Sequence, residues 1–129
     1  MSRPAPSSSN SQELAREAAR LTLTKRAEDV VILDLRGLDG VCDFFVIATG
    51  HSEIQVKAIA DAVEDGLRER GMRPWHSEGF EARRWVLLDY VDVVVHAFGA
   101  EERRYYDLER LWKDADRLSW EDGDAASSG

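Results

Sequence analysis

Two short apolar runs constrain the fold of this chain most strongly. Residues 29–35 read DVVILDL and residues 43–49 read DFFVIAT. Both are rich in β-branched and aromatic residues and nearly continuous in apolar character, which is typical of strands buried on both faces. Such strands need helices to cover them, so the pattern favours an α/β fold.

A clearly signalled helix follows the second run. Ser52 and Gln55 have the spacing of a capping box, in which the Ser52 side chain accepts a hydrogen bond from the backbone of Gln55. Gly71 and Pro74 end the helical pattern. Four apolar residues recur at helical spacing and are expected to face inward: Val56, Ile59, Val63 and Leu67.

Further elements complete the predicted domain. Residues 85–89 and 92–98 are apolar runs joined by a tight connection, which predicts a β-hairpin. A first helix is expected to start at Ser9 or Ser11 and to end near Arg26, and a last helix is expected over residues 100–114. The order of these elements predicts an α/β fold with a mixed β-sheet of about five strands flanked by helices.

The ends of the chain differ in composition from its middle. Residues 1–11 are rich in Ser and Pro, and residues 121–129 are acidic and small. Neither stretch has apolar periodicity, so both are expected to be disordered tails. Residues 12–120 are therefore expected to form a single α/β domain.

Charge and composition exclude several classes. The 129 residues include 17 basic and 25 acidic ones, for a formal net charge of −8, which argues against nucleic acid as the dominant direct partner. No apolar stretch approaches the length of a membrane span. Cys42 is the single cysteine, which predicts a reducing, cytoplasmic setting. Three scattered histidines and one cysteine argue against a structural zinc site, which needs four ligands.

Few residues are candidates for catalysis or for binding a metal ion or an anion. Asp89 and Asp92 flank the predicted hairpin turn and could hold a divalent ion, act as acid and base, or dock to a basic partner, although Asp is also a common turn residue. Residues 50–52 place Ser52 where a strand meets a helix, a position that suits an anion. No Asp-x-Asp motif follows it there, so Ser52 is better explained as the cap. No catalytic constellation remains, and a binding module is favoured.

Aromatic residues offer contact candidates beside their usual place in a core. Trp85 and Tyr90 border the predicted hairpin strand and are candidate anchors, because Trp, Tyr and Arg dominate interface hot spots. His96 lies in a valine-rich strand, where a core histidine and a contact histidine are both compatible with the pattern.

Several strings, taken in order, resemble the ribosomal silencing factor family, also called RsfS or Iojap. They are DFFVIATGHS at 43–52, QV at 55–56, EG at 78–79, WVLLDYVDVVVH at 85–96 and RYYDLERLW at 104–112. The resemblance covers about residues 12–114, nearly the whole expected domain. Taken together, the order and spacing of these strings are highly specific for this family, which no single string is.

The resemblance implies a protein that is not an enzyme and needs no cofactor or metal, with a fold similar to nucleotidyltransferases that have lost their active site. It implies binding to the large ribosomal subunit through ribosomal protein L14, a steric block to joining of the small subunit, and repression of translation in starvation or stationary phase. Homodimers are also implied. Matching positions give the expected partner-binding residues: Trp85, Asp89, Tyr90, Asp92, His96, Arg104 and Tyr105.

Two positions depart from the family pattern, and two alternatives remain. Val91 stands where the family usually has Gly, and a β-branched residue with positive φ would be strained. Ile54 stands where a basic residue is usual. The alternatives to a silencing factor are a nucleotidyltransferase-like enzyme and a homodimeric scaffold for ribosome assembly.

Overall fold

The computed structural model describes residues 8–38 and 42–120 of the chain. Its first helix begins at Ser8, so the residues just before position 12 belong to a helix and not to a tail. The rest of the expected tails, residues 1–7 and 121–129, lies outside the described residues.

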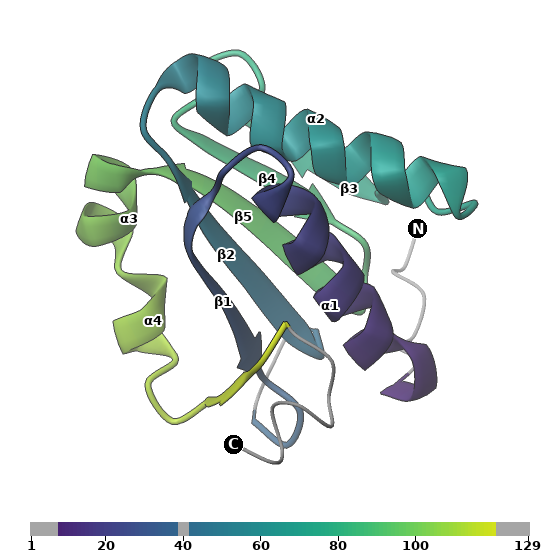
Figure 1. The fold of residues 1–129 in the computed structure, drawn as a ribbon. Coiled ribbons are helices and arrows are strands. Elements are labelled where there is room, and N and C mark those ends of the chain that lie inside the picture. Colours follow the sequence, from purple (N-terminus) through teal and green to yellow (C-terminus); the bar gives the residue numbers. More distant parts are fainter. Residues whose placement is uncertain (1–7, 39–41, 121–129) are drawn as a thin grey trace.

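The described residues form one mixed sheet with helices on both of its faces (Figure 1). The strand order is β3-β4-β5-β2-β1-β6. The strands are β1 (Glu28–Asp34), β2 (Phe44–Gly50), β3 (His76–Glu78), β4 (Trp85–Asp89), β5 (Val93–Gly99) and β6 (Asp116–Leu118). The predicted α/β class and mixed sheet are confirmed, with six strands in place of about five because two short edge strands carry no clear sequence signal.

The centre of the sheet is a parallel pair. β2 and β5 run side by side from Phe44 opposite Val93 to Gly50 opposite Gly99, and every other strand pairing is antiparallel. All seven residues of β2 are buried, as the continuous apolar run predicts. β1 is exposed at its start and buried only in its second half, because it lies nearer the sheet edge.

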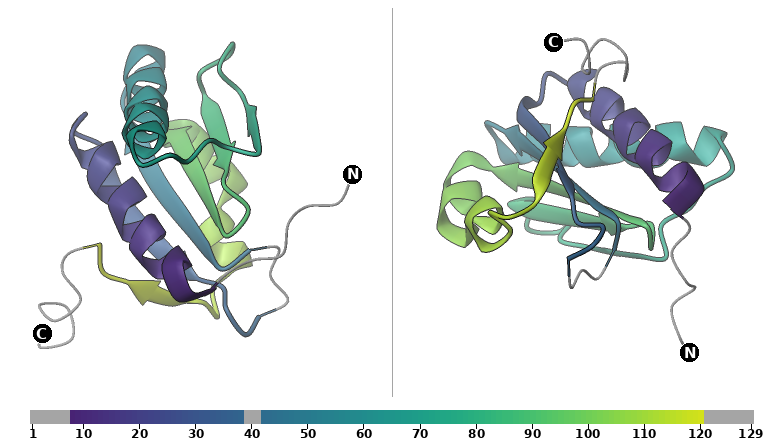
Figure 2. Two further views of the ribbon diagram at one scale, coloured as in Figure 1. Left: turned by 90° about the vertical axis from the view of Figure 1, so that its right-hand side faces the viewer. Right: turned by 90° about the horizontal axis from the view of Figure 1, so that it is seen from below.

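Helices α1 (Ser8–Leu23) and α2 (Glu53–Glu69) lie together across one face of the sheet (Figures 1 and 2). The capping box is confirmed: the Gln55 backbone donates to Ser52 Oγ at 3.1 Å, and Gln55 Oε1 accepts from the His51 backbone at 2.6 Å. The four residues expected to face inward from α2 are fully buried. Neither helix, nor any other in the described residues, is long and apolar enough to cross a lipid bilayer.

The last predicted helix is broken into two. α3 (Ala100–Tyr106) and α4 (Leu108–Leu111) are separated by Asp107, whose φ of 50° is left-handed. Asp adopts this conformation more readily than most residues, because its short polar side chain bonds locally. Leu108 and Trp112 pack against the sheet face opposite α1 and α2. α3 and α4 therefore cover part of that second face (Figure 2).

The predicted hairpin of β4 and β5 is confirmed, and its turn is strained. Val91 has a φ of 75°, and the Asp92 backbone donates to the Tyr90 carbonyl at 2.9 Å across it. An i to i+2 hydrogen bond around a residue with this φ is a rare, strained γ-turn. Asp89 Oδ1 accepts from the Val91 backbone at 2.8 Å and supports the turn.

Candidate interaction surface

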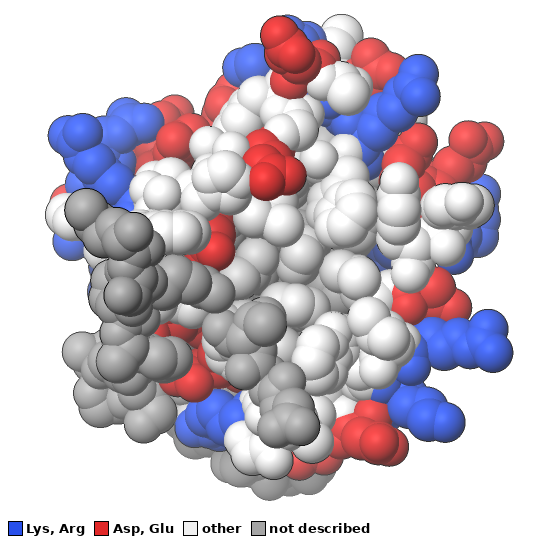
Figure 3. All heavy atoms as spheres, turned by 180° about the vertical axis from the view of Figure 1, so that it is seen from behind, with Lys and Arg blue, Asp and Glu red and all other residues white. Residues whose placement is uncertain are grey.

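The face of the sheet opposite α1 and α2 is the main candidate surface. Strand β4 alternates, so that Val86 and Leu88 face the two long helices while Trp85 and Leu87 face the other way. Figure 3 views this second side of the molecule, where uncharged atoms extend across the middle and charged side chains lie mostly around them. An uncharged area with charge around it is typical of a protein contact site, because the core of such a site is depleted of charged residues.

An aromatic cluster, formed by Trp85, His96, Phe98 and Tyr106, lies on this face. The Trp85 ring centroid lies 4.9 Å from that of Phe98 and 4.6 Å from that of Tyr106, and 5.9 Å from that of His96. Two of these residues, Trp85 and His96, were expected from the sequence to bind a partner. The structure brings them together at one end of β4 and β5, next to α3. His96 is only 3% exposed, however, so the expectation that it contacts a partner is corrected: it is a core histidine behind Trp85.

His96 holds the orientation of Trp85. The Trp85 indole Nε1 donates to His96 Nδ1 at 3.1 Å, which leaves the proton of the neutral ring on Nε2. His96 is buried, and its Nε2 has no hydrogen-bond partner in the described part of the chain. Burial lowers the pKa of His96 to about 3, so the ring is neutral at physiological pH.

A ledge beside the aromatic cluster, formed by Arg104, Tyr105, Tyr106, Arg110 and Leu111, is the most exposed apolar feature of α3 and α4. Tyr105 is 81% exposed, Leu111 is 72% exposed and Tyr106 is 48% exposed. Two open hollows of about 550 and 580 Å³ flank these side chains. The α3–α4 ledge includes the predicted residues Arg104 and Tyr105, and it combines two tyrosines with two arginines, the residue types enriched at interface hot spots.

The two predicted aspartates lie elsewhere. Asp89 and Asp92 stand at the hairpin turn, at the opposite end of β4 from Trp85. Asp89 is engaged in the turn, and the Asp92 carbonyl accepts from the backbones of Asp43 and Phe44 at 2.8 and 3.1 Å. The structure does not bring this acidic pair together with the α3–α4 ledge, so the predicted residues form two groups.

Tyr90 belongs to neither group. It is only 5% exposed and packs in the core formed under α1 and α2, on the other side of the sheet. Burial raises the pKa of its phenol, and its hydroxyl has no hydrogen-bond partner among the described residues. The expectation that Tyr90 is an exposed anchor is therefore corrected, because strand alternation turns its side chain inward.

Tyr106 and Leu111 were not expected at the surface. Leu111 follows the apolar spacing of a continuous helix, which predicts that it faces the core. The break at Asp107 rotates α4 relative to α3 and leaves Leu111 exposed. Tyr106 carries no separate sequence signal beyond its position next to Tyr105.

The surface has no metal site. Within residues 8–38 and 42–120, no group of three or more His, Cys, Asp or Glu side chains is placed to hold a metal ion. Cys42 is a buried thiol that donates to the Phe44 carbonyl at 3.3 Å. The chemistry of the surface is that of contact: aromatic rings, aliphatic side chains and arginines.

Comparison with known proteins identifies the family. The family model "Ribosomal silencing factor during starvation" matches residues 8–128. The chain is 46% identical over 106 residues to the ribosomal silencing factor RsfS of Bacillus subtilis, covering 82% of this chain and 90% of that protein. It is 45% identical over 112 residues to the RsfS of Halalkalibacterium halodurans, covering 87% and 96%.

A solved structure agrees with these matches. The crystal structure of a Chromobacterium violaceum protein superposes with a TM-score of 0.77 at 39% identity, covering 79% of this chain and 85% of that one. Silencing factors are regulators of the ribosome and not enzymes, so the expectation of a non-enzymatic protein is confirmed. The chain belongs to the ribosomal silencing factor (RsfS) family.

Proposed function

We propose that this protein binds the large ribosomal subunit through ribosomal protein L14 and sterically blocks joining of the small subunit, which represses translation in starvation. Family membership supports this function, since its relatives are named as ribosomal silencing factors. The structural observation that carries it is the α3–α4 ledge, whose exposed tyrosines and leucine adjoin the aromatic cluster.

The composition of this surface fits a protein partner. Tyr105, Tyr106 and Leu111 present large side chains with few rotatable bonds, and these supply contact area at a low cost in conformational entropy. The net charge of −8 favours approach to a basic ribosomal protein and disfavours a direct grip on RNA. Arg104 and Arg110 supply local hydrogen-bond donors within this acidic molecule.

Sedimentation with isolated large subunits tests the proposal. The wild-type protein should co-migrate with large subunits and lower the yield of joined ribosomes when small subunits are added. The double variant Tyr105→Ala and Leu111→Ala should bind at least tenfold more weakly, because truncating a hot-spot side chain costs about 2 kcal/mol or more.

Trp75→Ala is the matched control. Trp75 is also an exposed aromatic residue, at 49%, but it precedes β3 at the far edge of the sheet. This variant should bind as the wild type does. The proposed function would be refuted if the wild-type protein stayed at the top of the gradient. It would also be refuted if the yield of joined ribosomes were the same with and without the protein.

The acidic pair at the hairpin turn is a second proposed contact. Replacing Asp89 and Asp92 together by Lys reverses two charges at the end of the sheet away from the ledge. If the partner surface is basic and extends that far, the affinity falls while circular dichroism shows a folded domain. If the affinity of this double variant for large subunits is unchanged, the hairpin turn is not part of the interface, which is then limited to the end of the sheet beside the α3–α4 ledge.

A homodimer built on the same face would compete with ribosome binding. Its uncharged middle and the ledge are the surface that a second copy would also cover. The apparent affinity for large subunits should then fall as the protein concentration rises through the dimerisation range. An affinity that is independent of protein concentration would place any dimer contact on another face.

A further inference from the structure

Helices α3 and α4 display the ledge but have little apolar anchoring of their own. Neither helix contains a buried residue. Only Leu108 and the adjoining Trp112 pack, half-buried, against the sheet, while Tyr106 leans on Trp85. Helices of seven and four residues are not stable in isolation, so other contacts must hold the ledge in place.

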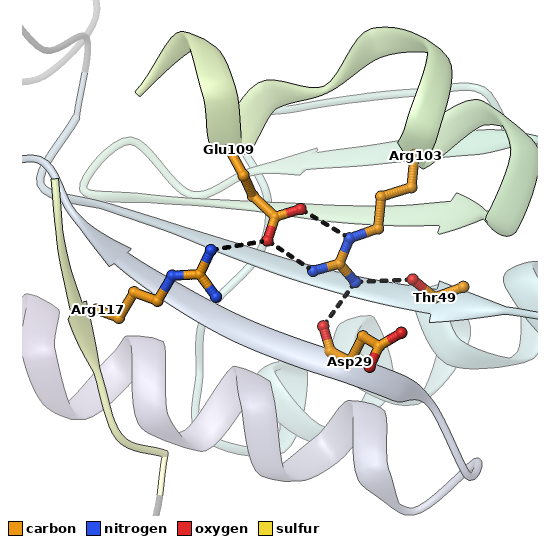
Figure 4. Close-up of polar contacts among 5 residues, drawn as sticks. All are labelled: Asp29, Thr49, Arg103, Glu109 and Arg117. Atoms are coloured by element: carbon orange, nitrogen blue, oxygen red, sulfur yellow. Dashed lines mark hydrogen bonds and ion pairs between the residues drawn. The ribbon is translucent and has the colours of Figure 1, made fainter. Parts of the chain in front are cut away.

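Arg103 makes those contacts (Figure 4). Its guanidinium donates to both carboxylate oxygens of Glu109 on α4, at 3.0 and 3.1 Å. The remaining terminal nitrogen donates to the Asp29 carbonyl at 2.6 Å and to Thr49 Oγ1 at 2.7 Å. One side chain on α3 therefore connects α4, β1 and β2, and only 12% of it is exposed.

The break at Asp107 is what allows Arg103 to meet Glu109. Residues six apart on an unbroken helix point in directions about 120° apart and are separated by about 9 Å along the axis. The left-handed residue between α3 and α4 folds the second helix back, so that the two side chains face each other.

Glu109 extends this network to the edge of the sheet. Its Oε2 also accepts from Arg117 of β6 at 3.3 Å. The hydrogen bond and the positive charge of Arg103 hold the pKa of Glu109 below its ordinary value, against the opposing effect of burial. The carboxylate is thus ionised and paired on both sides, and the network closes from α3 through α4 to β6.

We propose that Arg103 is a positioning residue for partner binding, which fixes the α3–α4 corner so that Tyr105, Tyr106 and Leu111 are presented in one arrangement. This inference rests on the proposed function for its consequence in binding. When the ledge is already held in its binding conformation, binding carries no free-energy cost for ordering α3 and α4. When only a fraction of the molecules have that conformation, the apparent affinity falls in proportion to that fraction. Arg103 itself points into the protein, where its guanidinium contacts Glu109, Asp29 and Thr49.

Amide hydrogen exchange of the full chain tests the positioning directly. Arg103→Met keeps an unbranched apolar stem but removes all four hydrogen bonds, and Arg103→Lys keeps the charge but not the paired geometry. Exchange in residues 100–112 should speed up at least tenfold in Arg103→Met and less in Arg103→Lys, while β2 and β5 remain the slowest-exchanging strands.

Binding to isolated large subunits supplies the second readout. The affinity should fall several-fold in Arg103→Met, with partial rescue in Arg103→Lys, and both variants should still unfold in one cooperative thermal transition. Arg68→Met is the matched control, because it removes an exposed Arg–Asp pair on α2, on the other side of the molecule. This control should leave both readouts as in the wild type.

Two results would overturn the inference. One is unchanged exchange in residues 100–112 of Arg103→Met, and the other is faster exchange with wild-type affinity. If Arg103→Met does not fold, Glu109→Gln weakens the same network from the other partner and should show the same local change at smaller size. Wild-type protein that fails to bind large subunits refutes the proposed function, while the exchange data still decide whether Arg103 holds the ledge.

Discussion

Acid should destabilise this protein through one buried side chain. His96 has a pKa lowered to about 3 by burial in the folded chain, against an ordinary value of 6.5 that applies when the chain unfolds. Between these two values the unfolded chain binds a proton that the folded chain does not. The free energy of unfolding therefore falls as the pH drops below 6.5 and stops falling near pH 3.

The magnitude follows from the distance between the pH and the ordinary pKa. Each pH unit in this window corresponds to about 1.36 kcal/mol for one proton. At pH 5, about 1.5 units below 6.5, His96 should have removed about 2 kcal/mol of the stability present at pH 7. That is a large part of the total for a domain of this size.

Urea unfolding at pH 7 and pH 5, followed by circular dichroism, measures the effect in the wild type and in His96→Asn. The Asn carbonyl replaces the acceptor that Nδ1 offers to the Trp85 indole but does not titrate. The variant is expected to be less stable at both pH values, because it fills less space, and to lose about 2 kcal/mol less between them. Equal losses in the two proteins would show that His96 is protonated in the folded state.

Three further substitutions have defined effects on the thermal midpoint and on urea unfolding. Val91→Gly should stabilise by up to about 1 kcal/mol, since relief of the left-handed φ of 75° exceeds the added freedom of the unfolded chain; a lower midpoint would contradict strain at this turn. Gly79→Ala should destabilise by about 3 kcal/mol, because φ is 92° and the added Cβ would overlap the Trp85 carbonyl; a change below 1 kcal/mol would count against it. Ser52→Ala should cost about 1 kcal/mol by removing the cap of α2, and Ser52→Asn should retain most of it.

The regular parts of the fold could be predicted from local sequence because each has its own signal. The box formed by Ser52 and Gln55 marks the start of α2 within the sequence itself, and the capping hydrogen bond confirms it. The hairpin is similarly marked by two apolar runs with a short gap, and β2 by an uninterrupted one. Each pattern is local, and tertiary contacts only reinforce it.

The parts that sequence reasoning missed depend on distant contacts. β3 and β6 are three residues each and mostly exposed, so hydrogen bonds to β4 and β1 define them and no apolar pattern does. The break at Asp107 has no Gly or Pro to mark it, and the partners of Arg103 on β1 and β2 are more than fifty residues away. The ledge could not be placed without that network.

For strands that are apolar throughout, the sequence also does not indicate which face of the sheet each side chain points to. Trp85 and Tyr90 both look like anchors beside the hairpin, yet one faces the open side of the sheet and the other the core under α2. Alternation separates them only once the register and the covered face are known. The resemblance to a family indicates which residues match its motifs, but not which way their side chains point.

The parallel pair at the middle of the sheet bears on how the chain folds during its own synthesis. β2 is completed early but keeps an unpaired apolar edge until α2, β3 and β4 have been made and β5 arrives beside it. The β4–β5 hairpin closes locally and quickly, whereas its docking on β2 spans a long stretch of chain and is expected to limit the folding rate. The nascent protein is thus most prone to aggregation just before β5 emerges.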